Sequence, residues 1–293
     1  MQELIFMKNY KNNEVLRNSF FELAVNTFEI NFEDWYQQGY WGEGYIPYSY
    51  VDGDQVIANV SINILELIIH GEKKKAIQIG TVMTHPDYRG KGLSTRLMNK
   101  VLEEYENKYD YMYLFANESV LDFYPKFGFK PVEEHLFSMN YTAKKSLKPA
   151  KLRKLDITNA DDLHLIQKFA SERLPVSRHF ATAQTQGILL FYCLNVFSND
   201  IYHLEDESAI VIYQKEENRI ELFDVVSLND INMKYILDKI ADEDTETITF
   251  HFTPDATEHL VLKSTLTNDG LFVRTPGDHL YPVQVKHPIT SIA

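Results

Sequence analysis

A short run of glycine and basic residues is the first feature of the sequence that could bind a ligand. Residues 77–100 read IQIGTVMTHPDYRGKGLSTRLMNK, so an apolar, strand-like stretch leads through the loop RGKGLS into a helical pattern. Glycines let a backbone turn tightly, and the free amides at a helix N-terminus attract anions. The GxxxxGK(S/T) phosphate loop is absent, and a GxGxxG dinucleotide motif would need glycine at Thr95. The loop therefore predicts an anion site of another kind, although read alone it also fits an ordinary helix-capping loop.

A second cluster, residues 117–129 (NESVLDFYPKFGF), follows the next strand-like segment. Together the two segments resemble the GCN5-related N-acetyltransferase (GNAT) superfamily, which transfers acetyl from acetyl-CoA to amines. The superfamily's Arg/Gln-x-x-Gly-x-Gly/Ala motif corresponds to Arg89, Gly92 and Ser94, with serine in place of the last glycine or alanine. Its Asn-x-x-Ala-x-x-Leu-Tyr segment, with the Gly-Phe that follows, corresponds to Asn117, Val120, Phe123, Tyr124, Gly128 and Phe129.

The resemblance implies the fold and the division of the chain. We expect an α+β (mixed α/β) GNAT fold with a central, mostly antiparallel, splayed sheet flanked by helices. The order strand, helix, strand recurs in both halves, so this fold is expected twice. The expected units are 1–142, a GNAT domain that binds acetyl-CoA and is closed by a strand at 136–141; 143–153, a polar linker; and 154–293, a degenerate GNAT-like domain. The second unit is not expected to bind CoA, because its loop at 227–230 has no glycine or arginine.

The resemblance also implies roles for individual residues. Backbone groups of Val82, Met83 and Thr84 would pair with the pantetheine arm, and Asn117, Phe123 and Phe127 would line the acyl-CoA channel. The pyrophosphate would lie on the amides of Arg89, Gly90, Lys91, Gly92, Leu93 and Ser94. Tyr124 corresponds to the tyrosine that protonates the departing thiolate, which a phenol within hydrogen-bond reach can do. Read on its own, Tyr124 also fits a packed core.

Aromatic residues are concentrated near the N-terminus and suggest where an acceptor would bind. Eight of them lie within residues 28–48: Phe28, Phe32, Trp35, Tyr36, Tyr40, Trp41, Tyr45 and Tyr48. Such rings could receive a cationic amine through cation–π contacts, and they fit equally a packed core or a domain interface. The residues selected as acceptor-binding candidates are Phe32, Trp35, Tyr36, Trp41 and Glu43.

The general base is left open by the sequence. The strand before the glycine loop, residues 76–80, reads AIQIG and lacks the carboxylate that many GNAT proteins carry there. Glu29, Asp34 and Glu43 are alternatives, and His85 is favoured as a structural residue. Resemblance to tandem relatives of the enhanced-intracellular-survival type adds Ala293, whose terminal carboxylate would reach the site.

Composition limits the classes of function. At 293 residues, with 44% hydrophobic and 24% charged residues, the chain fits two globular domains. The net charge of −13 disfavours nucleic-acid binding. No apolar run is long enough for a membrane span and no signal peptide is evident, so a cytoplasmic protein is expected. The single cysteine, Cys193, excludes an internal disulfide and a cysteine-clustered zinc site, and its apolar setting predicts a buried, inert thiol.

The expected function is that of an acyltransferase: transfer of acetyl from acetyl-CoA to a primary amine of a small molecule or peptide by direct attack, with Tyr124 as general acid. No metal, nucleic acid or membrane partner is expected. The second domain would shape the acceptor cleft or a homo-oligomer contact. One alternative is a non-catalytic acyl-CoA-binding regulatory module, and another is a structural protein that only keeps the fold.

Overall fold

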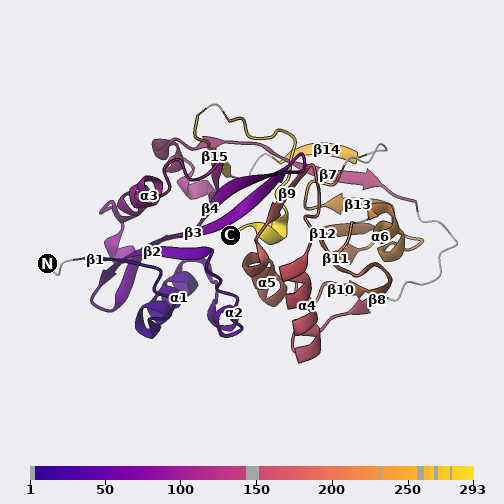
Figure 1. Cartoon of the computed structure of the whole chain (residues 1–293), viewed down its shortest axis with the longest axis horizontal. Coiled ribbons are helices and arrows are strands. Elements are labelled where there is room, and N and C mark those ends of the chain that lie inside the picture. Colours follow the sequence, from indigo (N-terminus) through magenta and orange to yellow (C-terminus); the bar gives the residue numbers. More distant parts are fainter. Residues whose placement is uncertain (1–3, 143–151, 231, 256–260, 267–269, 278) are drawn as a thin grey trace.

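Two sheets and their helices form the computed structural model, which describes residues 4–142, 152–230, 232–255, 261–266, 270–277 and 279–293. The sheets lie side by side, and the C-terminus lies between them (Figure 1). The helices of the described residues are α1 (Glu14–Phe28), α2 (Glu33–Gln37), α3 (Leu93–Glu104), α4 (Ala160–Glu172), α5 (Gln186–Asn195) and α6 (Met233–Ile240). None of these helices combines the length and apolar character that a bilayer crossing requires.

The first sheet has the order β1-β2-β3-β4-β5-β15-β6, with β9 paired to β3. Its strands are β1 (Ile5–Lys8), β2 (Tyr45–Asp52), β3 (Gln55–Ile69), β4 (Glu72–Thr84), β5 (Tyr111–Phe115), β15 (Leu271–Arg274), β6 (Lys130–Pro131) and β9 (Phe180–Ala183). Within this sheet β4 and β5 are parallel, and the other described pairs are antiparallel. Helix α3 packs its buried face on β2, β3 and β4.

The second sheet has the order β14-β7-β13-β12-β11-β10-β8. Its strands are β14 (Val261–Leu266), β7 (Glu134–Asn140), β13 (Thr247–Phe250), β12 (Arg219–Ser227), β11 (Ala209–Glu216), β10 (Ile201–Leu204) and β8 (Leu152–Lys154). Here β12 and β13 form the parallel pair, as β4 and β5 do in the first sheet. The expected fold class, a mostly antiparallel sheet with helices present twice, is therefore confirmed.

Each sheet contains a strand from the other half of the chain. The consecutive strands β6 and β7 separate, so that β6 stays in the first sheet while β7 lies between β13 and β14. The consecutive strands β14 and β15 separate in the same way, and β15 lies between β5 and β6. The strand predicted at residues 136–141 does form, but the expectation that it closes the first half was wrong. Of the predicted linker, residues 143–151 lie outside the described residues, and β8 begins at Leu152.

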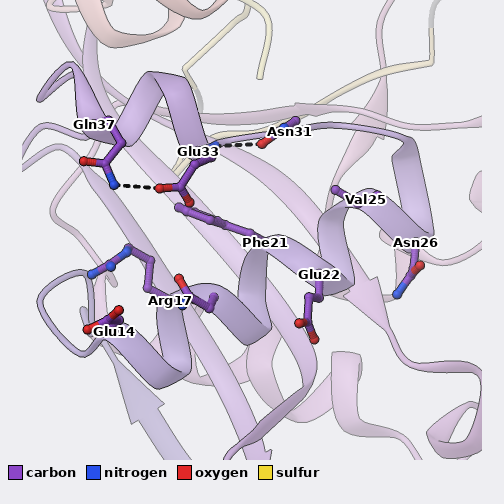
Figure 2. A pocket seen from close by; sticks show the side chains of 10 residues that line it. Glu14, Arg17, Phe21, Glu22, Val25, Asn26, Asn31, Glu33 and Gln37 are labelled. Carbon is purple, nitrogen blue, oxygen red and sulfur yellow. Dashed lines mark hydrogen bonds between the residues drawn. The ribbon is translucent and has the colours of Figure 1, made fainter.

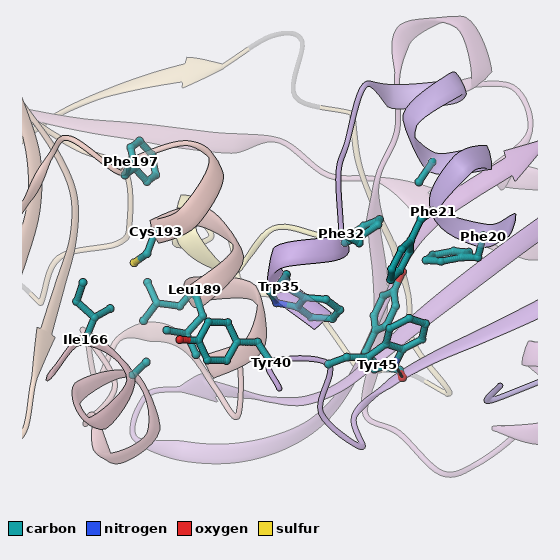
Figure 3. Close-up of a cluster of buried hydrophobic side chains, with 14 of the residues drawn as sticks. Phe20, Phe21, Phe32, Trp35, Tyr40, Tyr45, Ile166, Leu189, Cys193 and Phe197 are labelled. Atoms are coloured by element: carbon teal, nitrogen blue, oxygen red, sulfur yellow. Dashed lines mark hydrogen bonds between the residues drawn. The ribbon is translucent and has the colours of Figure 1, made fainter. Parts of the chain in front are cut away.

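The aromatic N-terminal segment forms the core between the two halves (Figure 3). The Trp35 indole Nε1 donates to the carbonyl oxygen of Gly187 in α5 at 2.7 Å. The rings of Phe32 and Phe191 approach to 5.5 Å between centroids. Cys193 lies in this cluster, and burial raises its pKa to about 12, as expected for an inert thiol. The expectation of a packed interface thus describes most of this segment.

Replacement of Gly187 by alanine tests how tightly the halves pack. An ideal Cβ at Gly187 would lie 2.9 Å from the Tyr40 carbonyl oxygen. Alanine normally favours a helix over glycine by up to about 1 kcal/mol, but this contact forces the halves apart. We expect Gly187→Ala to lower the free energy of unfolding by about 1–2 kcal/mol in urea titrations.

The control is Gly42→Ala, because no atom lies within 4 Å of the Cβ position at Gly42. If Gly187→Ala were as stable as the native protein, the Tyr40 carbonyl and its neighbours would be able to shift away from the new methyl group at little cost in free energy.

Candidate active site

The first site-forming feature is the separation of β4 from β5. The two strands pair in parallel only where Ala76–Ile79 lies beside Tyr111–Leu114. Beyond these residues β4 continues to Thr84 while β5 ends at Phe115, so the edge of β4 is left unpaired. A cavity of about 720 Å³ opens at this point, between the two halves of the chain.

A bulge in β4 shapes the floor of this cleft. Ser61 of β3 pairs with Gly80 and Asn59 pairs with Met83, so two β4 residues oppose a single β3 residue. Thr81, the first of the two, has φ of 48°, a left-handed conformation that β-branched residues rarely adopt. The bulge therefore stores backbone strain that other contacts must balance.

A buried hydrogen-bond network holds that bulge. Asn59 Nδ2 donates to the Thr81 carbonyl oxygen at 2.8 Å and to Ser61 Oγ at 2.9 Å. Ser49 Oγ donates to Asn59 Oδ1 at 2.8 Å, and the Thr81 and Tyr45 hydroxyls are 2.8 Å apart. The side chains of Ser49, Asn59 and Ser61 are fully buried, so these bonds form away from water. In such surroundings an unmade bond is costly, which fixes the path of β4.

The glycine loop forms one end of the cleft. Gly90 and Gly92 are left-handed, with φ of 75° and 72°, and Gly92 is the N-cap residue of α3. No side chain caps this helix, and the Arg96 amide is bonded to the Gly92 carbonyl oxygen, so the amides before Arg96 at the helix start have no partner within the helix. The Thr84 and Ser94 hydroxyls are 2.7 Å apart. The serine that departs from the GNAT pattern thus ties the end of β4 to the start of α3.

Tyr124 lies inside the cleft on a 3-10 turn (Tyr124–Phe127). Its side chain is buried, and desolvation raises its pKa to about 12. The phenol is therefore protonated throughout the neutral range and can donate a proton to an anion formed beside it.

The structure brings most of the predicted cofactor-binding residues to this one cleft. Those that line it are Val82, Met83, Thr84, Arg89, Ser94, Asn117 and Phe123, together with Tyr124. Gly90, Lys91 and Gly92 lie on the exposed loop next to it. The side chains of Leu93 and Phe127 face the core beneath α3 instead.

The acceptor candidates divide into two groups. Phe32 and Trp35 line the cleft. Tyr36, Trp41 and Glu43 do not: the Tyr36 ring stacks under the Arg17 guanidinium, Trp41 is buried, and Glu43 forms an exposed ion pair with Lys11. Residues of α5 that sequence reasoning did not find complete the wall, namely Ile188, Phe191 and Tyr192.

No Asp, Glu or His side chain is found among the described residues that line the cleft, so Glu29, Asp34, Glu43 and His85 lie outside it. Ala293, the last residue of the sequence, lines the cleft with Ile292. A Cβ built on Gly80 would lie 3.2 Å from the Ala293 carbonyl carbon, so the two residues are in direct contact.

Buried charges anchor the segment that carries Ala293. Thr290 Oγ1 donates to Asp224 Oδ2 at 2.5 Å, and Arg173 binds both oxygens of the same carboxylate at 2.6 and 2.7 Å. Asp224 is fully buried on β12. The second sheet thereby fixes the position of the last residues inside a cleft of the first sheet.

A second hollow lies away from this chemistry, on the outer face of α1 and α2 (Figure 2). Two hydrogen bonds join residues of its lining: Gln37 Nε2 donates to Glu33 Oε1 at 2.6 Å, and the Glu33 amide donates to Asn31 Oδ1 at 2.8 Å. Across the described part of the chain, no cluster of three or more His, Cys, Asp or Glu residues could hold a metal ion.

Comparison with known proteins gives one matching family and a set of similar folds. Residues 17–132 match the family described as an acetyltransferase (GNAT) domain. N-alpha-acetyltransferase 50 of Danio rerio is 34% identical over 104 residues, which are 34% of this chain and 52% of that protein. The match thus spans about half the length of this curated relative.

Three solved structures share the fold over most of the chain. A conserved Enterococcus faecalis V583 protein has a TM-score of 0.62 at 16% identity, covering 94% of this chain and 73% of its own. A GCN5-related N-acetyltransferase from Kribbella flavida has a TM-score of 0.58 at 17% identity, covering 93% and 71%. Eis1 from Mycobacterium abscessus has a TM-score of 0.57 at 13% identity, covering 94% and 74%. At these identities the similarity concerns the fold.

Replacement of Asn59 tests whether the buried network holds the bulge. Leucine has the same number and branching of side-chain heavy atoms but leaves the Thr81 carbonyl and Ser61 Oγ without the bond from Asn59. Ser49 Oγ also loses its Asn59 partner but keeps its bond to the Tyr10 hydroxyl. Because each unmade bond costs about 1–3 kcal/mol, we expect Asn59→Leu to lower the free energy of unfolding by about 3 kcal/mol or more in urea titrations. Asn195→Leu, at an exposed asparagine of α5, is the control, with an expected change within about 0.5 kcal/mol. Equal stability of both variants would mean that the network does not hold the bulge.

Proposed function

The chain belongs to the GNAT acetyltransferase family through residues 17–132, and we propose that it is an N-acetyltransferase that moves acetyl from acetyl-CoA to a primary amine of a small molecule or peptide. The observation that carries the proposal is a single cleft in which the unpaired edge of β4, the uncapped start of α3 and the buried Tyr124 meet. Each of these is a group that the proposed reaction needs.

The donor end of the cleft fits a thioester that carries a pyrophosphate. Two left-handed glycines leave the loop clear, since no atom lies within 4 Å of the Cβ positions of Gly90 and Gly92. The amides at the start of α3 and the Arg89 guanidinium offer donors and positive charge for phosphate oxygens. Val82, Met83 and Thr84 offer the β4 edge to an extended arm. Acetyl-CoA supplies the activated acetyl group when bound.

The chemistry assigned to the protein is proton transfer and positioning. As the amine nitrogen bonds to the acetyl carbon and the carbon–sulfur bond breaks, Tyr124 donates its phenolic proton to sulfur. Its raised pKa keeps the proton in place until that moment. In a polypeptide that ends at Ala293, the α-carboxylate would lie in the cleft beside Gly80 and would accept the proton that the amine loses.

The second half is proposed to hold no CoA. Its corresponding helix, α6, is capped by Asn232, whose side chain accepts from the Tyr235 amide at 3.2 Å. Asp230 stands before that helix start and pairs with Arg178 at 2.9 Å. A phosphate at this place would meet an occupied cap and a carboxylate. The contribution of the second half to the cleft is instead the wall formed by α5.

Binding of acetyl-CoA tests the donor site directly. Titration calorimetry of the whole chain is expected to show binding near one per chain. Gly92→Glu forces a side chain onto a left-handed residue and places negative charge beside the phosphates, so we expect affinity to fall at least about tenfold.

The matched control is Gly39→Glu, at a left-handed, exposed glycine with no atom within 4 Å of its Cβ position. Binding that survives Gly92→Glu unchanged would reject the loop as the phosphate site, and absence of binding in the native chain would reject the function.

Replacement of Tyr124 tests the proton donor. We expect Tyr124→Phe to lower kcat by about 10²-fold with little change in affinity for acetyl-CoA, because the ring is kept and the proton is lost. With the Tyr124 pKa near 12, ionisation removes the acid only at very high pH. The native rate should therefore show no decline from this group below about pH 10.

Tyr50→Phe, in the same core but outside the cleft lining, is the control variant. Unchanged turnover in Tyr124→Phe would exclude the phenol as the acid. Binding of acetyl-CoA without turnover on any amine would favour the non-catalytic acyl-CoA-binding module.

A further inference from the structure

The acceptor end of the cleft has a composition that selects among amines. Resting on the proposed acetyl transfer, we infer that the acceptor is a monoamine with an apolar or aromatic body, bound between the segment after α1 and helix α5, and that amines carrying a second charge in that body are poor substrates.

The wall at this end is built from apolar side chains of both halves. The end of α1 and the segment after it contribute Phe28, Ile30 and Phe32, and α5 contributes Ile188, Phe191 and Tyr192. The Phe32 and Phe191 rings lie 5.5 Å apart, so the two groups form one continuous surface. Figure 3 shows Phe32 and Trp35 lying between Phe20 and Phe21 of α1 and the labelled residues of α5, Leu189 and Cys193.

Part of this surface is open to the cleft. Phe28, Ile30, Phe191 and Tyr192 are only half-buried, in contrast to the fully buried core rings such as Phe20. Half-buried apolar side chains that line a cavity become more buried when an apolar ligand covers them, and removal of this apolar surface from water favours binding. The wall therefore favours a hydrocarbon or aromatic body.

The same wall offers no charge to a second ammonium group. Among the described lining residues there is no Asp or Glu side chain, and Arg89, at the loop end, is positive. The α-carboxylate proposed for Ala293 lies beside Gly80, at the end that receives the reacting nitrogen, and not in this wall. Burial raises the pKa of Tyr192 to about 12, so this phenol is uncharged as well. Of the nearby acidic residues, Glu29 is exposed and Glu33 binds Gln37 in the other hollow.

Two opposing free energies act on an ammonium group at this wall: cation–π attraction to the rings and the loss of its hydration. A cation–π contact contributes less free energy than an unpaired ammonium loses in hydration when it enters such a site. The aromatic wall therefore discriminates against a charged body although its rings attract cations. The reacting nitrogen is exempt, because it lies at the other end, toward Gly80 and Tyr124.

Two amines of equal length test this inference. n-Hexylamine and 1,5-diaminopentane have the same number of non-hydrogen atoms. The far end of n-hexylamine is a methyl group, whereas that of 1,5-diaminopentane is a second ammonium group. Release of thiol from acetyl-CoA is measured with each amine on the whole chain. We expect kcat/KM for n-hexylamine to be at least about tenfold higher, a difference of about 1.4 kcal/mol.

A charge placed in the wall should reverse the preference. In Phe191→Asp the new carboxylate can pair with the second ammonium, so the ratio of kcat/KM values should shift toward the diamine by about tenfold or more. Val196→Asp, at an exposed position just after α5, is the control and should keep the native ratio.

If Phe191→Asp does not fold, the ratio of kcat/KM values for the two amines in the native chain still tests the inference. Equal or better use of 1,5-diaminopentane by the native chain overturns the inference and leaves acetyl transfer standing. Thiol release with neither amine, nor with any other amine, overturns acetyl transfer itself and the inference with it.

Discussion

The cleft depends on one constraint: β4 must leave β5 after Ile79 and still continue as a strand. A regular parallel pair would close the sheet at this place and remove the site. The bulge at Thr81 redirects the strand, and its left-handed backbone is stable only because Asn59 binds the Thr81 carbonyl from a fully buried position. A polar network inside an apolar sheet costs stability unless every member is paired. Here that cost is offset by pairing, and what results is an open strand edge at a defined place.

The two halves are interlocked so that neither could supply the cleft alone. The first sheet needs β15 to cover β5, and the second needs β7 to join β13 to β14. The Arg173–Asp224–Thr290 cluster then carries the last residues from the second sheet into the cleft of the first. Because Asp224 is buried, loss of Arg173 would leave an uncompensated charge, which favours the paired position of Asp224 that Thr290 binds. A cleft wall from one half and a floor from the other therefore keep a fixed geometry.

Local chemistry made the donor end of the site readable from the sequence. Gly90, Gly92, Asn117 and Tyr124 lie close to each other along the chain, and the two segments that contain them resemble the GNAT motifs, which led us to expect them at one site. The strand exchange could not be read in this way. Residues 134–140 have the alternation of any strand, and their partners in β13 and β14 lie more than 100 residues away. Likewise, the pattern of Phe191 and Tyr192 indicates a buried helix but not that its edge faces a cavity.

The aromatic segment shows why composition alone could not separate a binding wall from a core. Phe32 and Trp41 share the same neighbours, Phe20 and Phe21, yet only Phe32 also reaches the cleft. What separates them is the approach of α5, a contact across the halves.

The two parallel strand pairs have the same topology, but the helices that connect their strands differ at their N-termini. In both sheets a strand leads into a helix and then into a parallel neighbour, β4–α3–β5 in one and β12–α6–β13 in the other. The helix starts nevertheless differ in what they can bind. Gly92 leaves the amides of α3 open, with Arg89 nearby, whereas the Asn232 side chain occupies the start of α6 behind Asp230. The N-terminus of α3 would attract an anion, whereas Asp230 before α6 would repel one. This difference arises although each helix has the positive end of its dipole at its N-terminus. The same architecture thus presents an open helix start in one half and a capped helix start in the other according to a few residues, while α5 of the second half lines the cleft of the first.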